Sequence, residues 1–320
     1  MSAPLTVWAV DGIGEIVRGD DLARIIHDHL PEPLQAGDVV VVTSKVVSKA
    51  AGLTSEGERD DLLDAETDRV VARRGMTRIV RTHGGLTLAA AGIDASNIAA
   101  GTIIALPRDP DGDARALRDR LVELCGVELG VIITDTAGRA WRVGQTDIAI
   151  GAAGIHPSLS FDGVTDAYGN LLAVTAPAVA DEIAGAADLV AGKLGGRPVV
   201  IVRGLPEELL DPGAPGASSL IRDEDGDLFG LGARDAVLAA TDPDAGAPRG
   251  FPAPEPGDDL LALARAGIDA ELVVVREDGG AVTISVVGGG PEAHVEAGRL
   301  VERISILAKA LRRDVAVTVG

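Results

Sequence analysis

Short runs of β-branched residues constrain the fold of this chain more than any other feature. Residues 131–133 read Val-Ile-Ile after Gly130, and a continuous apolar run of this length is typical of a buried strand. Residues 39–42 and 199–203 have the same character. Helical patterns separate these runs, so we expect buried strands packed against helices, with the helices at residues 21–30, 114–125 and 178–193.

An acidic residue between two hydroxyl residues follows one of these runs. Thr134, Asp135 and Thr136 stand where we expect that strand to end, and strand ends are where α/β proteins meet ligands. Oxygen ligands suit Mg²⁺ or Mn²⁺, which favour a few carboxylates together with substrate phosphates. Arg139 and Arg142 add cations that suit a phosphate or a carboxylate. Taken alone, the same segment also fits a strand followed by a polar turn.

The bulk composition excludes some classes of partner. At 320 residues the chain has room for one large or two medium domains. Aromatic residues make up only 2%, which leaves little surface for stacking on bases, and the formal net charge is -20. We therefore expect no non-specific binding to nucleic acid and none to an anionic membrane.

The sequence shows neither a targeting signal nor a pair of cysteines that could form an internal disulfide. Residues 1–5 have no basic region followed by an apolar run, and no apolar segment approaches membrane-spanning length. The single cysteine, Cys125, falls in a helical pattern and is expected to be a core thiol. A cytoplasmic location is the simplest expectation.

Weaker patterns indicate further elements and a boundary. We expect a helix at residues 64–74, a turn at 109–112, a strand at 171–175 and a loop at 206–218. A segment rich in Pro, Gly and Asp divides the chain into three expected parts. These are a large domain at 1–245, a linker at 246–257, and a small α+β appendage at 258–320 with the order α-β-β-α-β.

Several common catalytic signatures are missing from the sequence. There is no GxxxxGK[ST] phosphate loop, no GxGxxG fingerprint, and no HExxH or CxxC spacing. The five histidines are scattered, and no Ser/His or Cys/His triad can be assembled. A nucleotide, if one binds, must therefore bind through an uncommon scaffold.

Five ordered motifs point to such a scaffold. They are residues 10–15 with 19–22, residues 43–49, residues 91–97, residues 133–142 and residues 202–205. This series closely resembles the coenzyme F420 γ-glutamyl ligases, GTP-dependent enzymes that attach glutamate to a deazaflavin coenzyme. The resemblance is greatest to the bacterial, actinobacterial-type branch, and it extends from about residue 5 to residue 240. It implies an α+β fold with a mixed sheet.

The resemblance implies a nucleotide site made of four segments. Glycines let the backbone approach the nucleotide, and lysines offset phosphate charge in an acidic protein. For the lysines alone, solvation at the surface is the competing interpretation. The GTP-contacting residues implied are Gly12, Ile13, Gly14, Glu15, Ser44, Lys45, Lys49, Asn97, Asp211, Pro212, Gly213, Ala214, Pro215, Gly216, Ala217 and Ser218.

The resemblance also implies two divalent ions, Mg²⁺ or Mn²⁺, with K⁺ as an optional further ion. Asp94 and Asp135 match the carboxylates of the first ion, and Thr136 matches a ligand of the second. Archaeal-type enzymes carry a Gly-Glu-Gly run in the last nucleotide segment, where this chain has Ala-Pro-Gly at 214–216. A backbone carbonyl or a water is expected to replace the missing side-chain ligand.

The implied reaction joins an acid to an amine. The terminal carboxylate of the deazaflavin precursor attacks the γ-phosphate of GTP, and the amine of L-glutamate then displaces phosphate from the acyl phosphate. Arg139 and Arg142 are candidates for positioning a substrate carboxylate or phosphodiester, with an intramolecular salt bridge as the alternative. By resemblance, a homodimer is expected.

Two other functions stay open. A related GTP-dependent amide ligase would use a different acceptor or amino acid at the same site. A nucleotide-binding regulator would have lost catalysis through the altered loop at 211–218. Some bacterial relatives carry a fused flavin-binding, nitroreductase-like domain, but residues 258–320 are too few for one, so we expect no flavin cofactor.

Overall fold

The structure is a computed structural model, and it describes residues 4–94, 102–173, 175–223, 227, 229–242, 259–278 and 281–320. The chain divides into two compact units, Met1–Ile221 and Arg222–Gly320. Each unit has a core of its own and a mixed sheet, so the expected α+β class with a mixed sheet is confirmed.

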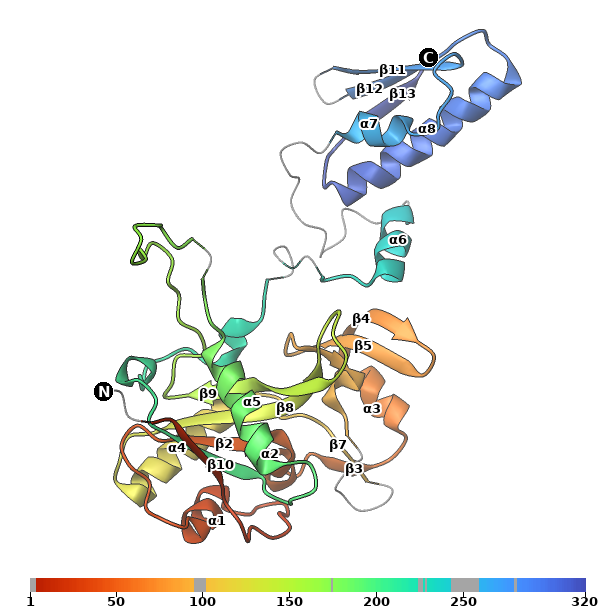
Figure 1. Cartoon of the computed structure of the whole chain (residues 1–320). Helices are drawn as coiled ribbons and strands as arrows, with labels where there is room; N and C mark the ends of the chain where they lie inside the picture. The colour runs from red at the N-terminus through yellow and green to blue at the C-terminus, as the bar shows by residue number, and fades with distance from the viewer. Residues whose placement is uncertain are drawn as a thin grey trace. The chain divides into compact units, whose positions relative to one another are not determined.

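A five-stranded sheet forms the centre of the first unit (Figure 1). Its order is β1 (Thr6–Ala9), β10 (Val199–Arg203), β2 (Val39–Thr43), β8 (Gly130–Gly138) and β9 (Gln145–Ala153). The neighbours β2 and β8 are parallel, whereas the other pairs are antiparallel. The buried strands expected at 39–42, 131–133 and 199–203 are confirmed.

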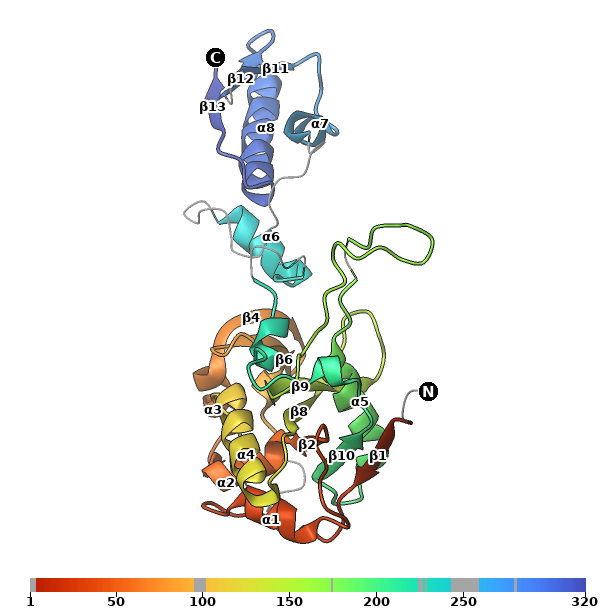
Figure 2. The same cartoon turned by 90° about the vertical axis from the view of Figure 1, so that its left-hand side faces the viewer.

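Helices cover both faces of this sheet (Figures 1 and 2). On one face lie α1 (Leu22–His29), α2 (Ser44–Ala51) and α4 (Pro110–Cys125), and on the other lies α5 (Val179–Ala191). Successive side chains of a strand point to opposite faces, so Val40 packs with the first group and Val41 with α5. The stretches 39–42, 131–133 and 199–202 are therefore apolar at every position.

A three-stranded antiparallel sheet replaces the helix that we expected at residues 64–74. The helix α3 (Arg59–Glu66) ends early, and the chain continues as β4 (Thr67–Arg74), β5 (Thr77–Thr82) and β6 (Thr87–Ala89). Pairing with β5 buries Val71 and Val80, and burial in a sheet overrides the helical preference of the charged residues. Next to it lie the 3₁₀ turn η1 (Ala90–Gly92) and the strand pair β3 (Thr54–Glu56) and β7 (Thr102–Ile104).

Three other expectations are wrong in detail. The segment 109–112 is the start of α4, because Asp109 caps the helix by accepting the Gly112 N–H and Pro110 occupies its first turn. Residues 171–175 form no strand where they are described, since this loop pairs mainly with its own other arm, as in the Thr165–Leu171 bridge. The loop at 206–218 contains η2 (Glu207–Leu209) and the start of η3 (Ala217–Leu220).

The second unit matches the expected order of elements. After α6 (Ala233–Thr241) come α7 (Leu260–Arg265), β11 (Val273–Asp278), β12 (Ala281–Val286), α8 (Pro291–Ala310) and β13 (Ala316–Val319). The strands β11 and β12 form an antiparallel pair, and β13 pairs in parallel with β12. The expected linker at 246–257 lies outside the described residues, so that boundary stays a prediction. Within the described residues, no helix has both the length and the apolar character needed to cross a bilayer.

Candidate functional site

The two parallel strands of the main sheet diverge at the candidate site. Thr43 and Thr134 are register partners, but the next residue of β2, Ser44, begins α2, whereas β8 continues for several residues paired with β9. Asp135 therefore lies within β8 and not at its end, which corrects the sequence expectation. Among the described residues, the pairing of β8 with β2 stops at Thr134, so Asp135 has no strand partner on that side.

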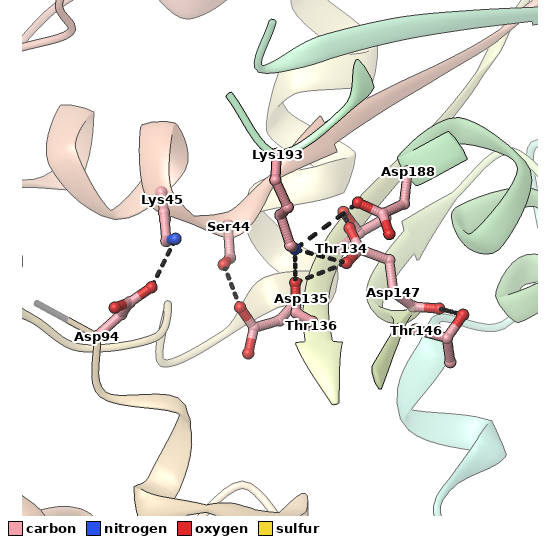
Figure 3. A network of polar contacts seen from close by, with 10 residues as sticks. All are labelled: Ser44, Lys45, Asp94, Thr134, Asp135, Thr136, Thr146, Asp147, Asp188 and Lys193. Atoms are coloured by element: carbon pink, nitrogen blue, oxygen red, sulfur yellow. Dashed lines mark hydrogen bonds and ion pairs between the residues drawn. The ribbon is translucent and has the colours of Figure 1, made fainter. Parts of the chain in front are cut away.

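Ser44 and Asp135 meet at this divergence (Figure 3). The Ser44 hydroxyl donates a hydrogen bond of 3.1 Å to Oδ1 of Asp135. Burial raises the pKa of the Asp135 carboxyl to about 6. The hydrogen bond from Ser44 and the charge of Lys45 act in the opposite direction, to lower that pKa. A bound cation would favour the charged form in the same way.

The first turn of α2 holds the other predicted carboxylate. Lys45 Nζ lies 2.5 Å from Oδ2 of Asp94, whose backbone bridges to Ile104 of β7. Because Ser44 and Lys45 are consecutive, Asp94 and Asp135 are gathered around one helix N-terminus (Figure 3). Residues far apart in the sequence thus meet as the resemblance implies.

The glycine loop lies beside the same helix. Gly12 has φ of 84°, a conformation that favours glycine, and Glu15 accepts an ion pair of 2.7 Å from Lys49. The Glu15–Lys49 pair therefore joins the loop of residues 12–15 to α2. Two of the four nucleotide segments expected from the sequence, residues 12–15 and 44–49, lie at this helix. The third, Asn97, lies outside the described residues.

A second polar cluster lies on the opposite face of β8. Thr136 Oγ1 donates to Oδ1 of Asp147 at 2.7 Å, and Thr134 Oγ1 donates to Oδ2 at 3.1 Å. Lys193, just beyond the end of α5, donates to Thr136 Oγ1 at 2.7 Å (Figure 3). Alternation along the strand thus separates the side chain of Asp135, on the α2 face, from that of Thr136, on the α5 face.

The loop of residues 211–218 is held by a residue of α4. Asp111 accepts N–H groups from Ala217 and Ser218 of this loop and from Ala152 of β9, at 2.7, 3.1 and 2.9 Å. Asp211 lies 3.4 Å from His156. The polar contacts described for this loop therefore lead to α4 and β9, and not to Asp135.

Arg139 and Arg142 lie in the exposed turn between β8 and β9. Their side chains make no ion pair or hydrogen bond with a residue that the structure describes. The intramolecular salt bridge considered as an alternative is therefore not formed within those residues. Both guanidinium groups are accessible to an anionic ligand.

Sequence reasoning assigned no role to three side chains that shape the site: Asp111, Asp147 and Lys193. The alternation of Thr134 and Thr136 on one strand face was a signal that an acceptor must lie opposite them. Nothing local marks Lys193, because its contact with Thr136 depends on how α5 packs on the sheet.

The donor set suits hard cations but is sparse. Within the ranges that the structure describes, no group of three or more His, Cys, Asp and Glu side chains is placed to hold one metal ion. The gathered ligands are carboxylate and hydroxyl oxygens, which fit Mg²⁺ or Mn²⁺ if phosphate oxygens and waters complete the coordination. The residues therefore fit a metal that arrives together with a phosphate ligand.

Comparison with known proteins identifies similar chains. A family model described as F420-0:Gamma-glutamyl ligase matches residues 12–59 and 61–204. The coenzyme F420:L-glutamate ligase of Methanopyrus kandleri is 39% identical over 233 residues, which cover 66% of this chain and 92% of that protein. The protein of the same name from Archaeoglobus fulgidus is 39% identical over 220 residues, 62% of this chain and 87% of its own length. That of Methanothermobacter thermautotrophicus is 37% identical over 250 residues, 70% of this chain and 98% of its own length.

Proposed function

Because this chain belongs to the F420-0:gamma-glutamyl ligase family, we propose that it is a ligase that joins L-glutamate to coenzyme F420 at the expense of GTP. The observation that carries the proposal is that the matched residues, 12–59 and 61–204, include every side chain gathered around α2. Family and geometry thus point to the same region.

The proposed reaction has two steps. A carboxylate oxygen of the deazaflavin precursor attacks the γ-phosphorus of GTP, the bond to the β,γ-bridging oxygen breaks, and GDP leaves. The amine of L-glutamate then attacks the acyl phosphate, forming an amide and releasing phosphate and a proton. A bare carboxylate would have to expel oxide, so phosphorylation supplies a leaving group. The protein's task is then positioning and charge neutralisation.

We assign the nucleotide to the α2 end of the site. Gly12, Ile13, Gly14 and Glu15 form the loop beside the helix, and Ser44, Lys45 and Lys49 present a helix N-terminus and two ammonium groups. Backbone N–H groups and lysines together attract phosphate in a protein whose net charge is -20. Asn97 and the loop Asp211–Ser218 belong to the proposed nucleotide site by resemblance.

We assign Asp94 and Asp135 to one divalent ion and Thr136 to a second. Mg²⁺ or Mn²⁺ held there would neutralise charge on the transferring phosphate, with K⁺ as an optional further ion. Asp135 and Asp94 approach the same helix turn from two different elements, which supports a shared ion. Thr136 faces α5, where its hydroxyl donates to Asp147 and accepts from Lys193.

We further propose a homodimer formed through two exposed arms of the first unit. Trp141 and Val143 of the β8–β9 turn are 82% and 101% exposed, and Tyr168 and Leu171 of the long loop before α5 are 92% and 69% exposed. Exposed apolar groups of this size mark interaction sites. Light scattering of the Trp141→Ser variant tests the assembly, since loss of the dimer is expected.

The decisive experiment is mass spectrometry of the deazaflavin precursor after incubation with the protein, GTP, Mn²⁺ and L-glutamate, with GDP quantified in parallel. A glutamyl adduct matched by GDP release is expected. GTP turnover with another amino acid or acceptor would indicate a related amide ligase. GTP binding without turnover would indicate a regulator, with the loop at 211–218 as the first place to examine.

A further inference from the structure

The hydroxyl of Thr136 is held from two sides on the α5 face of β8 (Figure 3). It donates its proton to Oδ1 of Asp147 at 2.7 Å and accepts a proton from Lys193 Nζ at the same distance of 2.7 Å. A threonine hydroxyl has a single proton, so the Asp147 contact leaves only lone pairs on Thr136 Oγ1 for other partners. That oxygen is therefore oriented to receive a cation.

Lys193 Nζ occupies a cation position among three oxygens. Besides Thr136 Oγ1, it lies 3.9 Å from Oδ1 of Asp147 and 3.7 Å from Oδ1 of Asp188. Two carboxylates thus face one ammonium group, and the local charge is not balanced by the lysine alone. An ion of higher charge would balance it better.

The oxygens are fixed, whereas the ammonium group is accessible. The side chain of Asp147 is only 13% exposed and is held by Thr134 as well as Thr136, but that of Lys193 is 64% exposed. Lys193 also lies beyond Gly192, the residue that ends α5. An incoming ion can therefore replace the ammonium group without disturbing the oxygens.

We propose that Lys193 is an internal cation that competes with a divalent ion for the oxygens of Thr136 and Asp147. Asp147 is the positioning residue, because it takes the Thr136 proton and turns the oxygen toward the cation. This proposal rests on one part of the proposed function, namely that Thr136 is a ligand of a divalent ion. The resemblance assigns no role to Asp147 or to Lys193.

The test measures Mn²⁺ binding to the full chain without nucleotide, from the electron paramagnetic resonance signal of free Mn²⁺. Replacing Lys193 by methionine keeps the length of the side chain and removes the competing charge, so the dissociation constant should fall about tenfold. Lys193→Arg keeps the charge and should remain near wild type. Lys309→Met, the same substitution in the second unit, is the matched control for the change in net charge and should have no effect.

A double variant localises the effect. Asp147→Asn removes one of the two carboxylate acceptors of Thr134 and Thr136 and should weaken Mn²⁺ binding about tenfold. In the double variant with Lys193→Met, the increase in Mn²⁺ affinity that Lys193→Met causes alone should be lost. If Asp147→Asn fails to fold, Thr136→Val removes the other oxygen of the proposed site, Thr136 Oγ1, with little change in volume, and should have the same two effects. An unchanged or weaker Mn²⁺ affinity in Lys193→Met, or a gain that persists without Asp147, would overturn the proposal.

Failure of this inference and failure of the proposed function are distinguishable, because the Mn²⁺ assay contains neither GTP nor deazaflavin. If the protein forms the glutamyl adduct but Lys193→Met leaves the Mn²⁺ dissociation constant unchanged, the proposed ligase function stands and the proposed competition by Lys193 is wrong. If the Mn²⁺ dissociation constant falls tenfold in Lys193→Met but no adduct forms, the competition by Lys193 stands and the ligase assignment is wrong.

Discussion

At the residue scale, Asp135 combines requirements that oppose each other. Its carboxylate is placed where a cation and a phosphate are expected, yet burial raises its pKa to about 6. The cost of burying this charge is offset only partly by the Ser44 hydroxyl and Lys45. In the absence of a cation, Asp135 is therefore expected to reduce the stability of the folded protein at neutral pH.

We predict that Asp135→Asn is more stable than wild type at pH 8 in the presence of a chelator. The pKa of about 6 lies above the ordinary value of 3.8 for an aspartate, so the folded state binds this proton more tightly than the unfolded state. The carboxyl's contribution to stability is then lost as pH rises from about 4 to about 6. Asparagine resembles the protonated acid, and the gain should be about 1 to 2 kcal/mol after allowance for solvent screening. Urea denaturation at pH 4.5 and pH 8 measures it, and an equal difference at both values would contradict the explanation.

The same substitution should abolish most of the ligase activity. Asp135→Asn and Asp94→Asn each remove a charged oxygen ligand, so turnover should fall at least ~10²-fold. GDP release measures turnover, and circular dichroism checks the fold. Near-normal turnover in either variant would remove that residue from the metal assignment.

At the element scale, the β8–β9 hairpin depends on a bulge. Register shifts between Ile133 and Thr134, so β9 has an extra residue there. The N–H of Ala149 turns to Oδ1 of Asp181 at the start of α5, at 2.8 Å. Asp181 thereby anchors the strand that presents Asp147, and the helix and the hairpin are positioned together.

We predict that Asp181→Ala destabilises the protein by about 1 to 3 kcal/mol, because the Ala149 N–H loses its acceptor at a partly buried position. Hydrogen exchange at Ala149 should become faster. Its neighbour Glu182, exposed on the same helix turn, supplies the control: Glu182→Ala should leave both quantities unchanged. Normal protection of Ala149 in Asp181→Ala would show that the bulge is held by other contacts.

The loop of residues 211–218 depends on a glycine. A Cβ on Gly216 would come within 2.1 Å of the Asp111 carboxylate, which holds this loop through the N–H groups of Ala217 and Ser218. The loop and the start of α4 can approach each other only if residue 216 has no side chain. The Ala-Pro-Gly sequence at 214–216 thus retains the glycine that this contact requires.

We predict that Gly216→Ala raises the KM for GTP several-fold and lowers the melting temperature by a few degrees, since the three hydrogen bonds of Asp111 cannot all survive. Gly213→Ala is the matched control, because its Cβ would lie 3.4 Å from Oδ1 of Asp211, an ordinary contact. Steady-state kinetics and a thermal melt measure the two effects. Equal effects of both substitutions would argue against a specific role for Asp111.

At the scale of the whole molecule, the chain contains two separate cores. The first unit is built around both faces of the main sheet, and the second around α7, α8 and the sheet β11–β12–β13. Every residue of the candidate site lies in the first unit. The second unit therefore contributes no identified site residue.

We predict that Leu300→Ala destabilises the second unit by about 2 to 5 kcal/mol and leaves ligase turnover unchanged. Leu300 is fully buried in the second core, so its truncation leaves a cavity there. Hydrogen exchange followed by mass spectrometry should show faster exchange in α8 and β12 and no change in β2 and β8. Loss of protection in both units would indicate that they unfold as one.

The buried strands and the helices α1, α4, α5, α7 and α8 follow from sequence alone, because their signals are local, whereas α2 at the candidate site was not predicted. Runs such as residues 39–42 and 199–202 are apolar at every position, which is typical of a strand covered on both faces. The carboxylates Asp94 and Asp135 were predicted as site residues by resemblance; the structure places them against Lys45 and Ser44, in the first turn of α2, and their role in a metal site stays a prediction.

Tertiary structure alone decided the features that depend on distant partners. Residues 67–74 are a strand because β5 pairs with them, although their charges favour a helix. The contact of Lys193 with Thr136 and the hydrogen bonds from the loop at 211–218 to Asp111 each join segments far apart in the chain. The pairing of Asp147 with Thr136 depends on the register between β8 and β9. No local pattern records such contacts, because they exist only once the sheet has brought its two covering layers of helices into place.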